Sequence, residues 1–207
     1  AGCKLCAEED VVLVGMNERL NLFGYLYLGA LDEDYVLSGM SGILDIVLAL
    51  EWVRDNIAVF GGDANNVTLI GESGGAMKIS HLLALERAVG LFHRAILMSG
   101  AAPVGTCSRE VASQFTERLM RVCGIEKRSW DKLLSMPARV LFDAYNSPSV
   151  MGADALGLIP VADGKELLDN PEGEWRTYEW SRNIPVIVGA SEDEVGMGFS
   201  QFEMTWE

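Results

Sequence analysis

The stretch Val67-Thr68-Leu69-Ile70-Gly71-Glu72-Ser73-Gly74-Gly75 decides how this chain is interpreted. Its first four residues are mostly apolar and β-branched, which is typical of a strand buried in a parallel sheet. Apolar residues at helical spacing follow from about Gly75 to Leu85. We therefore expect Ser73 in a tight turn between a strand and a helix, with Gly71 and Gly75 on either side. A serine in such a turn stands clear of its own backbone and exposes its hydroxyl to a carbonyl carbon.

The helix that follows Ser73 offers a second feature of a nucleophilic serine. The first N–H groups of a helix have no intrahelical acceptor, and the helix dipole favours negative charge beside them. We therefore expect the backbone N–H of Gly74 to bind the oxyanion that forms when Ser73 attacks a carbonyl carbon. The pentapeptide alone leaves an alternative open, in which Ser73 merely caps a helix within a glycine-rich connection.

The rest of the chain alternates between strand and helix patterns. Further strands are predicted at residues 11–14, 92–98 and 184–189, and further helices at 41–57, 108–123 and 130–141. Residues 17–39 and 146–164 are predicted to be mostly irregular. This alternation implies right-handed crossovers, and so an α/β fold with a mainly parallel sheet and helices on both faces, in one domain over 1–207.

Composition excludes several functional classes. Sixteen Lys and Arg against thirty Asp and Glu give a net charge of -14, which repels nucleic acid and anionic lipid headgroups. Apolar stretches such as Ile43–Leu50, which contains Asp45, are shorter than the roughly 20 residues of a membrane span. The first residues lack the pattern of a signal peptide. We expect a cytoplasmic protein with no nucleic-acid or membrane partner.

The four cysteines predict neither a metal site nor a cofactor. Cys3 and Cys6 are three residues apart, but Cys107 and Cys123 are too widely spaced to complete a zinc site. Free thiols are the simpler interpretation for a chain of this size. We therefore expect the protein to work without metal or cofactor.

Several short sequence motifs occur together and in order along the chain. They are Asn17–Leu20, Phe23–Gly24, Ala49–Val53, Asn56–Ile57, Phe60–Asp63, Asn66–Thr68, Gly71–Gly75, Leu91–Ile96 and Pro160–Gly164. Together they resemble the type-B carboxylesterases, the family of bacterial para-nitrobenzyl esterases and cholinesterases, over nearly all of the chain. The resemblance implies an α/β-hydrolase fold. It also implies hydrolysis of small-molecule carboxylic esters through a serine nucleophile, here Ser73, and an acyl-enzyme.

The resemblance also suggests the acid of a catalytic triad. The segment Ser191–Gly196, which follows the last predicted strand, is similar to the family segment that carries this carboxylate, and Glu194 is the matching residue. Glu194 comes after Ser73, which is the order of nucleophile and acid expected in this fold. The alternative is a solvated acidic loop, because Glu192, Asp193 and Glu194 are consecutive.

A triad also needs an imidazole as its base, and the chain contains only His81 and His93. Both precede Glu194, whereas the catalytic histidine of the family follows the acid by a long interval. The family's glycine-rich oxyanion loop, with its His-Gly-Gly word, has no counterpart in residues 1–10. We therefore expect an internal portion of a longer esterase, incomplete at both ends, with the catalytic histidine and this loop absent from it.

An incomplete sheet has exposed edges, which are expected to promote self-association. A noncatalytic interaction module, or an inactive fragment on the same fold, is the alternative function. Recruitment of His81 or His93 as the base of a minimal enzyme is a further alternative.

Overall fold

Three parallel strands form the sheet in a computed structural model of the chain, which describes residues 2–100, 106–151, 158–164, 166–167 and 180–194. They are β1 (Thr68–Glu72), β2 (Arg94–Met98) and β3 (Val186–Gly189), in that spatial order. The register pairs Glu72 with Met98 and Met98 with Gly189. All three strands therefore end at the same edge of the sheet. These strands were predicted to within about two residues at each end.

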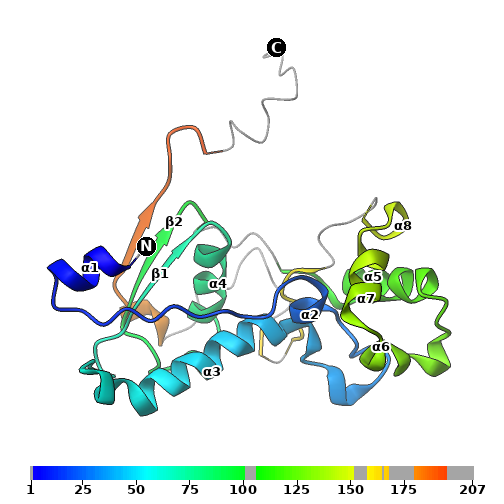
Figure 1. Ribbon diagram of the computed structural model, residues 1–207, viewed down its shortest axis with the longest axis horizontal. Helices are drawn as coiled ribbons and strands as arrows, with labels where there is room; N and C mark the ends of the chain where they lie inside the picture. Colours follow the sequence, from blue (N-terminus) through cyan, green and yellow to red (C-terminus); the bar gives the residue numbers. More distant parts are fainter. Residues whose placement is uncertain (1, 101–105, 152–157, 165, 168–179, 195–207) are drawn as a thin grey trace.

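The helices divide between the two ends of the molecule (Figure 1). They are α1 (Cys3–Glu8), α2 (Asn21–Tyr25), α3 (Ser41–Asn56), α4 (Gly74–Leu83), α5 (Arg109–Val122), α6 (Lys132–Ser135), α7 (Ala138–Tyr145) and α8 (Pro148–Met151). Short 3-10 turns are η1 (Glu33–Tyr35), η2 (Ser38–Met40), η3 (Ile57–Phe60), η4 (Glu86–Ala88), η5 (Lys127–Ser129) and η8 (Ser181–Asn183). Helices α3 and α4 accompany the sheet, whereas α5 to α8 gather at the opposite end. The family-level expectation of a parallel sheet with helices is thus met.

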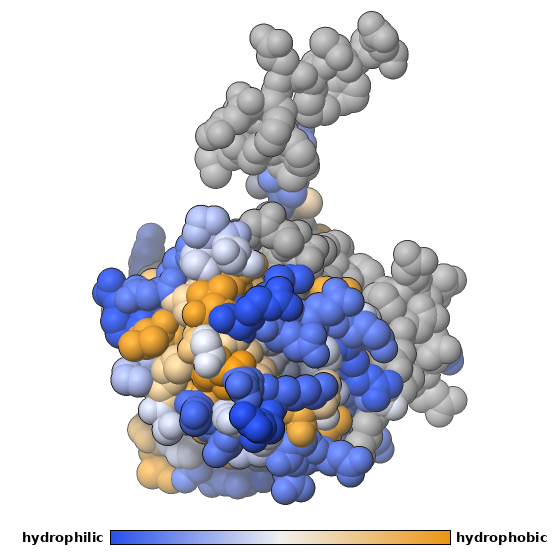
Figure 2. Space-filling model, turned by 90° about the vertical axis from the view of Figure 1, so that its right-hand side faces the viewer, coloured by the Kyte–Doolittle hydropathy of each residue, from blue (hydrophilic) through white to orange (hydrophobic). Residues whose placement is uncertain are grey.

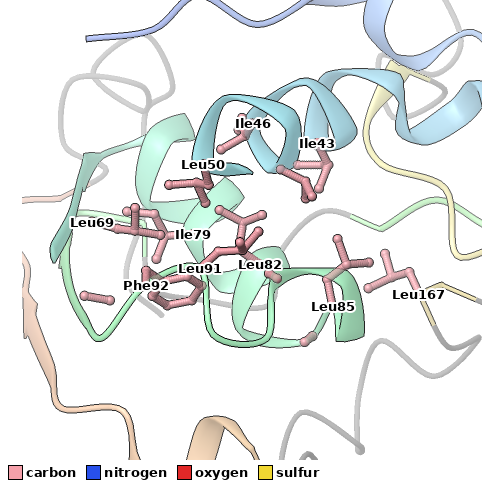
Figure 3. Packing of buried hydrophobic residues seen from close by; sticks show 14 of the residues in the cluster. Ile43, Ile46, Leu50, Leu69, Ile79, Leu82, Leu85, Leu91, Phe92 and Leu167 are labelled. Carbon is pink, nitrogen blue, oxygen red and sulfur yellow. The ribbon is translucent and has the colours of Figure 1, made fainter. Parts of the chain in front are cut away.

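The largest core cluster lies between α3, α4 and the sheet. Figure 3 shows Ile43, Ile46 and Leu50 of α3 facing Ile79 and Leu82 of α4. Their spacing along α3 is three and four residues, so one helical face is apolar and buried. A second cluster joins α5 and α7 to the chain around α2, and the partly buried Leu158 packs against both clusters. The assignment of the whole chain to one domain stays a prediction.

Polar contacts attach the segment before α2 to the helices beneath it. The guanidinium of Arg19 donates to both carboxylate oxygens of Asp45 on α3, at 2.8 and 2.7 Å. This pairing lowers the pKa of Asp45 below its ordinary value, because the charged carboxylate accepts the hydrogen bonds. Next to it, Glu18 pairs with Lys78 of α4, and both side chains are largely buried. The segment is thereby fixed across α3 and α4.

The prediction of a buried strand at Val11–Val14 is wrong. Each of these four side chains is 40–47% exposed, and the segment has no strand partner among the described residues. An apolar run predicts which side chains prefer burial, but a strand exists only where a neighbour completes its hydrogen-bond ladder. In the described part of the chain, β1 pairs with β2 alone.

The prediction of one helix over residues 130–141 is also wrong. The structure has two, α6 and α7, separated at Met136 and Pro137. Met136 has an extended backbone, with φ -71° and ψ 135°. A residue before proline is driven from the helical region by the proline ring, so the break follows from Pro137 itself.

The segment Glu33–Phe60 is long and apolar enough to cross a membrane by length and composition, contrary to the expectation that no stretch is. In the structure it comprises η1, η2, α3 and η3, and α3 packs on α4 through buried side chains. It also carries Asp45, which is bound by Arg19. Core helices of globular proteins meet the same criterion of length and apolar composition. The segment is therefore only weak evidence for a membrane span.

The sheet has two exposed margins within the described residues. The side chains of Val186, Ile187 and Val188 on β3 are 41–64% exposed, and Ile70 on β1 is 52% exposed. Unpaired strand edges with apolar side chains favour pairing with other chains. Self-association through these edges stays a prediction.

Candidate active site

Ser73 occupies the turn between β1 and α4, as its sequence context predicts. Its backbone has φ 52° and ψ -119°, a region that non-glycine residues rarely enter. Two hydrogen bonds hold it there: the Ser73 N–H donates to the Met98 carbonyl at 2.9 Å, and the Ser73 carbonyl accepts from the Met77 N–H at 3.0 Å. Such backbone strain costs on the order of 1–3 kcal/mol and clusters at functional sites. The Ser73 residue is exposed.

The two glycines around Ser73 have different roles. A Cβ added to Gly71 would lie 2.5 Å from the Gly75 carbonyl carbon and 2.7 Å from the Ala76 nitrogen. A Cβ added to Gly75 would meet nothing within 4 Å. Close approach of α4 to the end of β1 therefore requires Gly71, while Gly75 contributes only its backbone. Gly100 adds a third constraint, since a Cβ there would lie 2.3 Å from the Ser73 carbonyl oxygen.

Gly74 is the first residue of α4, and Ser73 is its N-cap. The Gly74 N–H is therefore one of the N-terminal donors that lack an intrahelical acceptor. It follows Ser73 directly, and a Cβ added to Gly74 would meet nothing within 4 Å. This geometry permits the predicted oxyanion role of Gly74, which stays a prediction.

Ser99 lies beside Ser73 and was missed as a functional residue. It directly follows β2, and because Glu72 pairs with Met98 the two serines are level on neighbouring strands, roughly 4.8 Å apart in the backbone. Ser99 also has a positive φ, 53°, and its N–H donates to the Gly189 carbonyl at 2.8 Å. The available signal was a small polar residue at the carboxyl end of a parallel strand, where α/β folds place their ligands.

Glu194 lies on the loop after β3, at the same edge of the sheet. A hydrogen bond with the Ser99 side chain lowers the pKa of Glu194, and a further bond, donated by the Ser191 N–H at 2.7 Å, acts in the same direction. Both bonds favour the ionised carboxylate. The structure thus links Glu194 to the strand next to Ser73 through Ser99, although no direct contact between Glu194 and Ser73 is described.

Neither histidine lies at this edge. His81 is eight residues along α4 from Ser73, about 12 Å at helical rise, and its Nδ1 lies 2.7 Å from the Met77 carbonyl oxygen. His93 precedes β2, so it lies at the amino end of the sheet, about 20 Å from the level of Ser99. There its Nδ1 accepts a hydrogen bond from the Val67 N–H at 3.2 Å. These positions argue against the alternative that His81 or His93 serves as the base.

The described residues contain no group of three or more His, Cys, Asp or Glu side chains arranged to hold a metal ion. The four cysteines are free thiols, with Cys3 and Cys6 exposed and Cys107 buried. The polar groups at the carboxyl edge of the sheet include the side chains of Ser73, Ser99 and Glu194 and the Gly74 amide at the start of α4. This set is suited to acyl transfer through a serine hydroxyl.

Comparison with known proteins agrees with this arrangement. A sequence profile of the carboxylesterase family matches residues 1–205. The chain belongs to the carboxylesterase family. Para-nitrobenzyl esterase of Bacillus subtilis (strain 168) is 38% identical to this carboxylesterase-family chain over 196 residues. Acetylcholinesterase 1 of Caenorhabditis elegans is 32% identical over 200 residues.

Solved structures of the family show the same fold. A carboxylesterase of Geobacillus stearothermophilus, determined at pH 6.2, matches 98% of this chain with a TM-score of 0.86 at 38% identity. A PNB esterase matches 92% of the chain with a TM-score of 0.81 at 36% identity. The fold of this carboxylesterase-family chain is therefore that of the α/β-hydrolases.

The carboxylesterase-family chain spans a minority of each relative's length. It covers 39% of the Bacillus subtilis esterase and 93% of itself in that match, and 32% of the Caenorhabditis elegans enzyme and 92% of itself in the other. In the structural matches it covers 41% and 40% of the two solved chains.

Proposed function

We propose that this chain carries the nucleophile and the acid of a serine carboxylic ester hydrolase. The observation that carries the proposal is the backbone of Ser73. It is held in a strained positive-φ conformation at the carboxyl edge of the sheet, directly before the first N–H groups of α4. A merely structural turn at this position would be relieved by glycine, which adopts positive φ without strain. Retention of a serine there favours a chemical role for its hydroxyl.

In the proposed reaction, the Ser73 Oγ attacks the ester carbonyl carbon and its proton passes to a general base. The carbonyl oxygen becomes an oxyanion, which accepts a hydrogen bond from the Gly74 N–H. Collapse of the tetrahedral intermediate breaks the ester C–O bond, and the alcohol leaves with a proton. Water then attacks the acyl-enzyme by the same route, releasing the acid and restoring Ser73.

The base in this proposal is an imidazole other than His81 and His93, supplied from outside these 207 residues. Glu194 orients that imidazole and stabilises its charged form, as the acid of a triad does. The hydrogen bond with the Ser99 side chain lowers the pKa of Glu194, which fits this role, because the acid of a triad has to stay ionised. Ser99 supports it as well, by holding the carboxylate with its side-chain hydrogen bond.

The substrates proposed are small carboxylic esters. The relatives are a para-nitrobenzyl esterase and an acetylcholinesterase, and both names denote hydrolysis of an ester. The exposed Ser73 and the amide of Gly74 act on the ester group common to both. We propose this class without a preference for one alcohol.

Covalent labelling tests the proposal. A fluorophosphonate forms a stable adduct with a serine whose surroundings stabilise an oxyanion. Intact-mass and peptide analysis should find this adduct on Ser73, with labelling accelerated by added imidazole that replaces the missing base. Ser73→Ala should abolish it, while the matched control Ser135→Ala, which removes an exposed serine hydroxyl elsewhere, should label normally. Equal labelling of Ser73→Ala would refute the assignment.

Ester turnover gives a second readout. Triad members act as a unit, so without the base only residual catalysis is expected, about 10³–10⁴-fold over water at most. Hydrolysis of para-nitrophenyl butyrate should therefore be slow and should depend on Ser73, with the Ser73→Ala protein as the blank for imidazole's own reaction. A noncatalytic interaction module would show neither labelling nor Ser73-dependent turnover, even with imidazole present.

A further inference from the structure

A small hollow lies at the opposite end of the molecule from Ser73. Its volume is about 270 Å³, and it is lined by Leu31, Glu117, Met120, Arg121, Ile125 and Lys127. The lining belongs to the end of α5, the turn that follows it and the loop after α2. Figure 2 views this end of the molecule, where exposed apolar residues lie among hydrophilic ones.

The end of α5 explains the apolar floor of the hollow. Gly124 has φ 67°, a left-handed conformation that terminates the helix and turns the chain back. The Ile125 N–H then donates to the Met120 carbonyl at 2.8 Å, and the Gly124 N–H to the Arg121 carbonyl at 3.1 Å. These bonds bring Ile125 back to Met120 and satisfy two of the carbonyls at the C-terminal end of α5.

The rim of the hollow carries two cationic side chains, Arg121 and Lys127, and one acidic side chain, Glu117. Among the ion pairs and hydrogen bonds of the described residues, none involves the side chain of Arg121, Lys127 or Glu117. Residues 106–151 contain seven Lys and Arg against five Asp and Glu, a net charge of +2. The whole chain carries -14, so the remaining residues carry -16. The α5 side of the hollow therefore belongs to a slightly cationic part of the chain, whereas Leu31 on its other side is followed by Asp32, Glu33 and Asp34.

We propose that this hollow binds a small amphipathic monoanion, of the class of medium-chain alkanoates. Arg121 and Lys127 bind the carboxylate, and the planar guanidinium offers two parallel N–H donors to its two oxygens. With Glu117 on the rim, the lining carries a net charge of +1, which matches a monoanion better than a phosphate dianion. Leu31, Met120 and Ile125 contact the alkyl chain.

The size of the hollow limits the ligand. Pockets for drug-sized molecules occupy roughly 300–1,000 Å³, so 270 Å³ suits a short chain. The proposal concerns a surface distinct from the carboxyl edge of the sheet and does not depend on ester hydrolysis. Its failure would leave the assignment of Ser73 untouched.

Methyl NMR of the protein labelled with [methyl-¹³C]methionine tests the site, because the Met120 methyl reports on the floor. Hexanoate should shift this signal in a saturable manner. Exposed ion pairs are each typically worth about 1.4- to fivefold in affinity, so Arg121→Gln with Lys127→Gln should weaken binding at least about twofold. The matched control Lys132→Gln with Arg139→Gln removes the same charges off the hollow and should change affinity by less than about twofold.

Three ligand comparisons complete the test. Hexanol and acetate should each bind more weakly than hexanoate, since one lacks the charge and the other the alkyl chain. Hexanoate shifting no Met120 signal would overturn the proposal, as would equal binding of hexanol and hexanoate. Tighter binding of inorganic phosphate than of hexanoate would also overturn it, by showing a plain anion site. Equal weakening of hexanoate binding by the control pair would overturn the proposal too, because binding would then depend only on the net charge of the protein.

Discussion

Replacement of Gly71 by alanine should separate the two glycines of the Ser73 turn. The added Cβ would lie 2.5 to 2.7 Å from three backbone atoms of Gly75 and Ala76, whereas carbon contacts are normally about 3.5–4.0 Å. The first turn of α4 would have to move by roughly 1 Å. Overpacking costs about 1–3 kcal/mol, and we expect the upper end because the obstacle is backbone and not a flexible side chain.

Gly75→Ala is the matched control, because a Cβ there meets nothing within 4 Å. Alanine within the first turn of α4 should raise the free energy of unfolding by about 0.5–1 kcal/mol through its helix propensity. The two variants should thus differ by about 4 kcal/mol. With an m-value near 2 kcal/mol/M, their urea midpoints should be about 2 M apart. Fluorophosphonate labelling of Ser73 should fall with Gly71→Ala, since a displacement of 1 Å costs about 100-fold in reaction rate.

Equal midpoints for the two variants would refute this reasoning, because the close approach of α4 to β1 would then be no constraint. Loss of stability in Gly75→Ala comparable to that in Gly71→Ala would refute it as well. A Gly71→Ala protein that labels as fast as the wild type would show that Ser73 does not depend on the position of α4.

Three further predictions concern the polar groups of the fold. Ser99→Ala should raise the pKa of Glu194 toward its ordinary value, which ¹³C NMR of labelled glutamate can measure. Because the pKa of Glu194 is lowered in the folded state, the ionised carboxylate stabilises the fold at pH values above its unfolded pKa. This contribution is lost as the pH falls through the folded pKa. Burial raises the pKa of Tyr25 to about 12, so stability should fall as pH rises from about 10 to 12. The hydroxyl of Tyr25 has no hydrogen-bond partner in the described structure, so Tyr25→Phe should leave stability unchanged or higher and abolish this alkaline loss in urea unfolding. Thr116→Val should cost about 1–2 kcal/mol in thermal unfolding, because the buried Thr116 hydroxyl donates to the Tyr27 carbonyl at 2.7 Å.

The sequence predicted elements well where local chemistry determines them. Apolar spacing along α3 and α5 identified both helices, and Ser108 before α5 is the N-cap, accepting from the Val111 N–H at 3.3 Å. Pro137 is a local signal for the break between α6 and α7, because a residue before proline avoids the helical conformation. The prediction of a single helix did not take this effect on Met136 into account. In contrast, Val11–Val14 shows the limit of local pattern, because pairing depends on a neighbour distant in sequence.

The candidate site divides in the same way. Ser73 and Gly74 were predictable because one pentapeptide encodes the strand, the turn and the helix start. Glu194 was predictable only through family resemblance, since three consecutive acidic residues are more typical of a solvated loop. Ser99 was missed because its importance comes from register: only the pairing of Glu72 with Met98 places it level with Ser73.

This dependence on register makes the β2–β3 pairing the sensitive element of the site. Ser73, Ser99 and Glu194 follow three successive strands, so their relative positions are set by two ladders of backbone hydrogen bonds. The side chains of β3 are exposed, whereas those of β1 and β2 alternate between exposed and buried. Segments with little buried apolar area open first in native-state fluctuations. Opening of β3 would remove Glu194 from Ser99 while the turn at Ser73, fixed by Gly71, Gly100 and the Met98 carbonyl, stayed intact. The acid is therefore the part of the site that depends most on contacts covering β3, and the nucleophile the part that depends on them least.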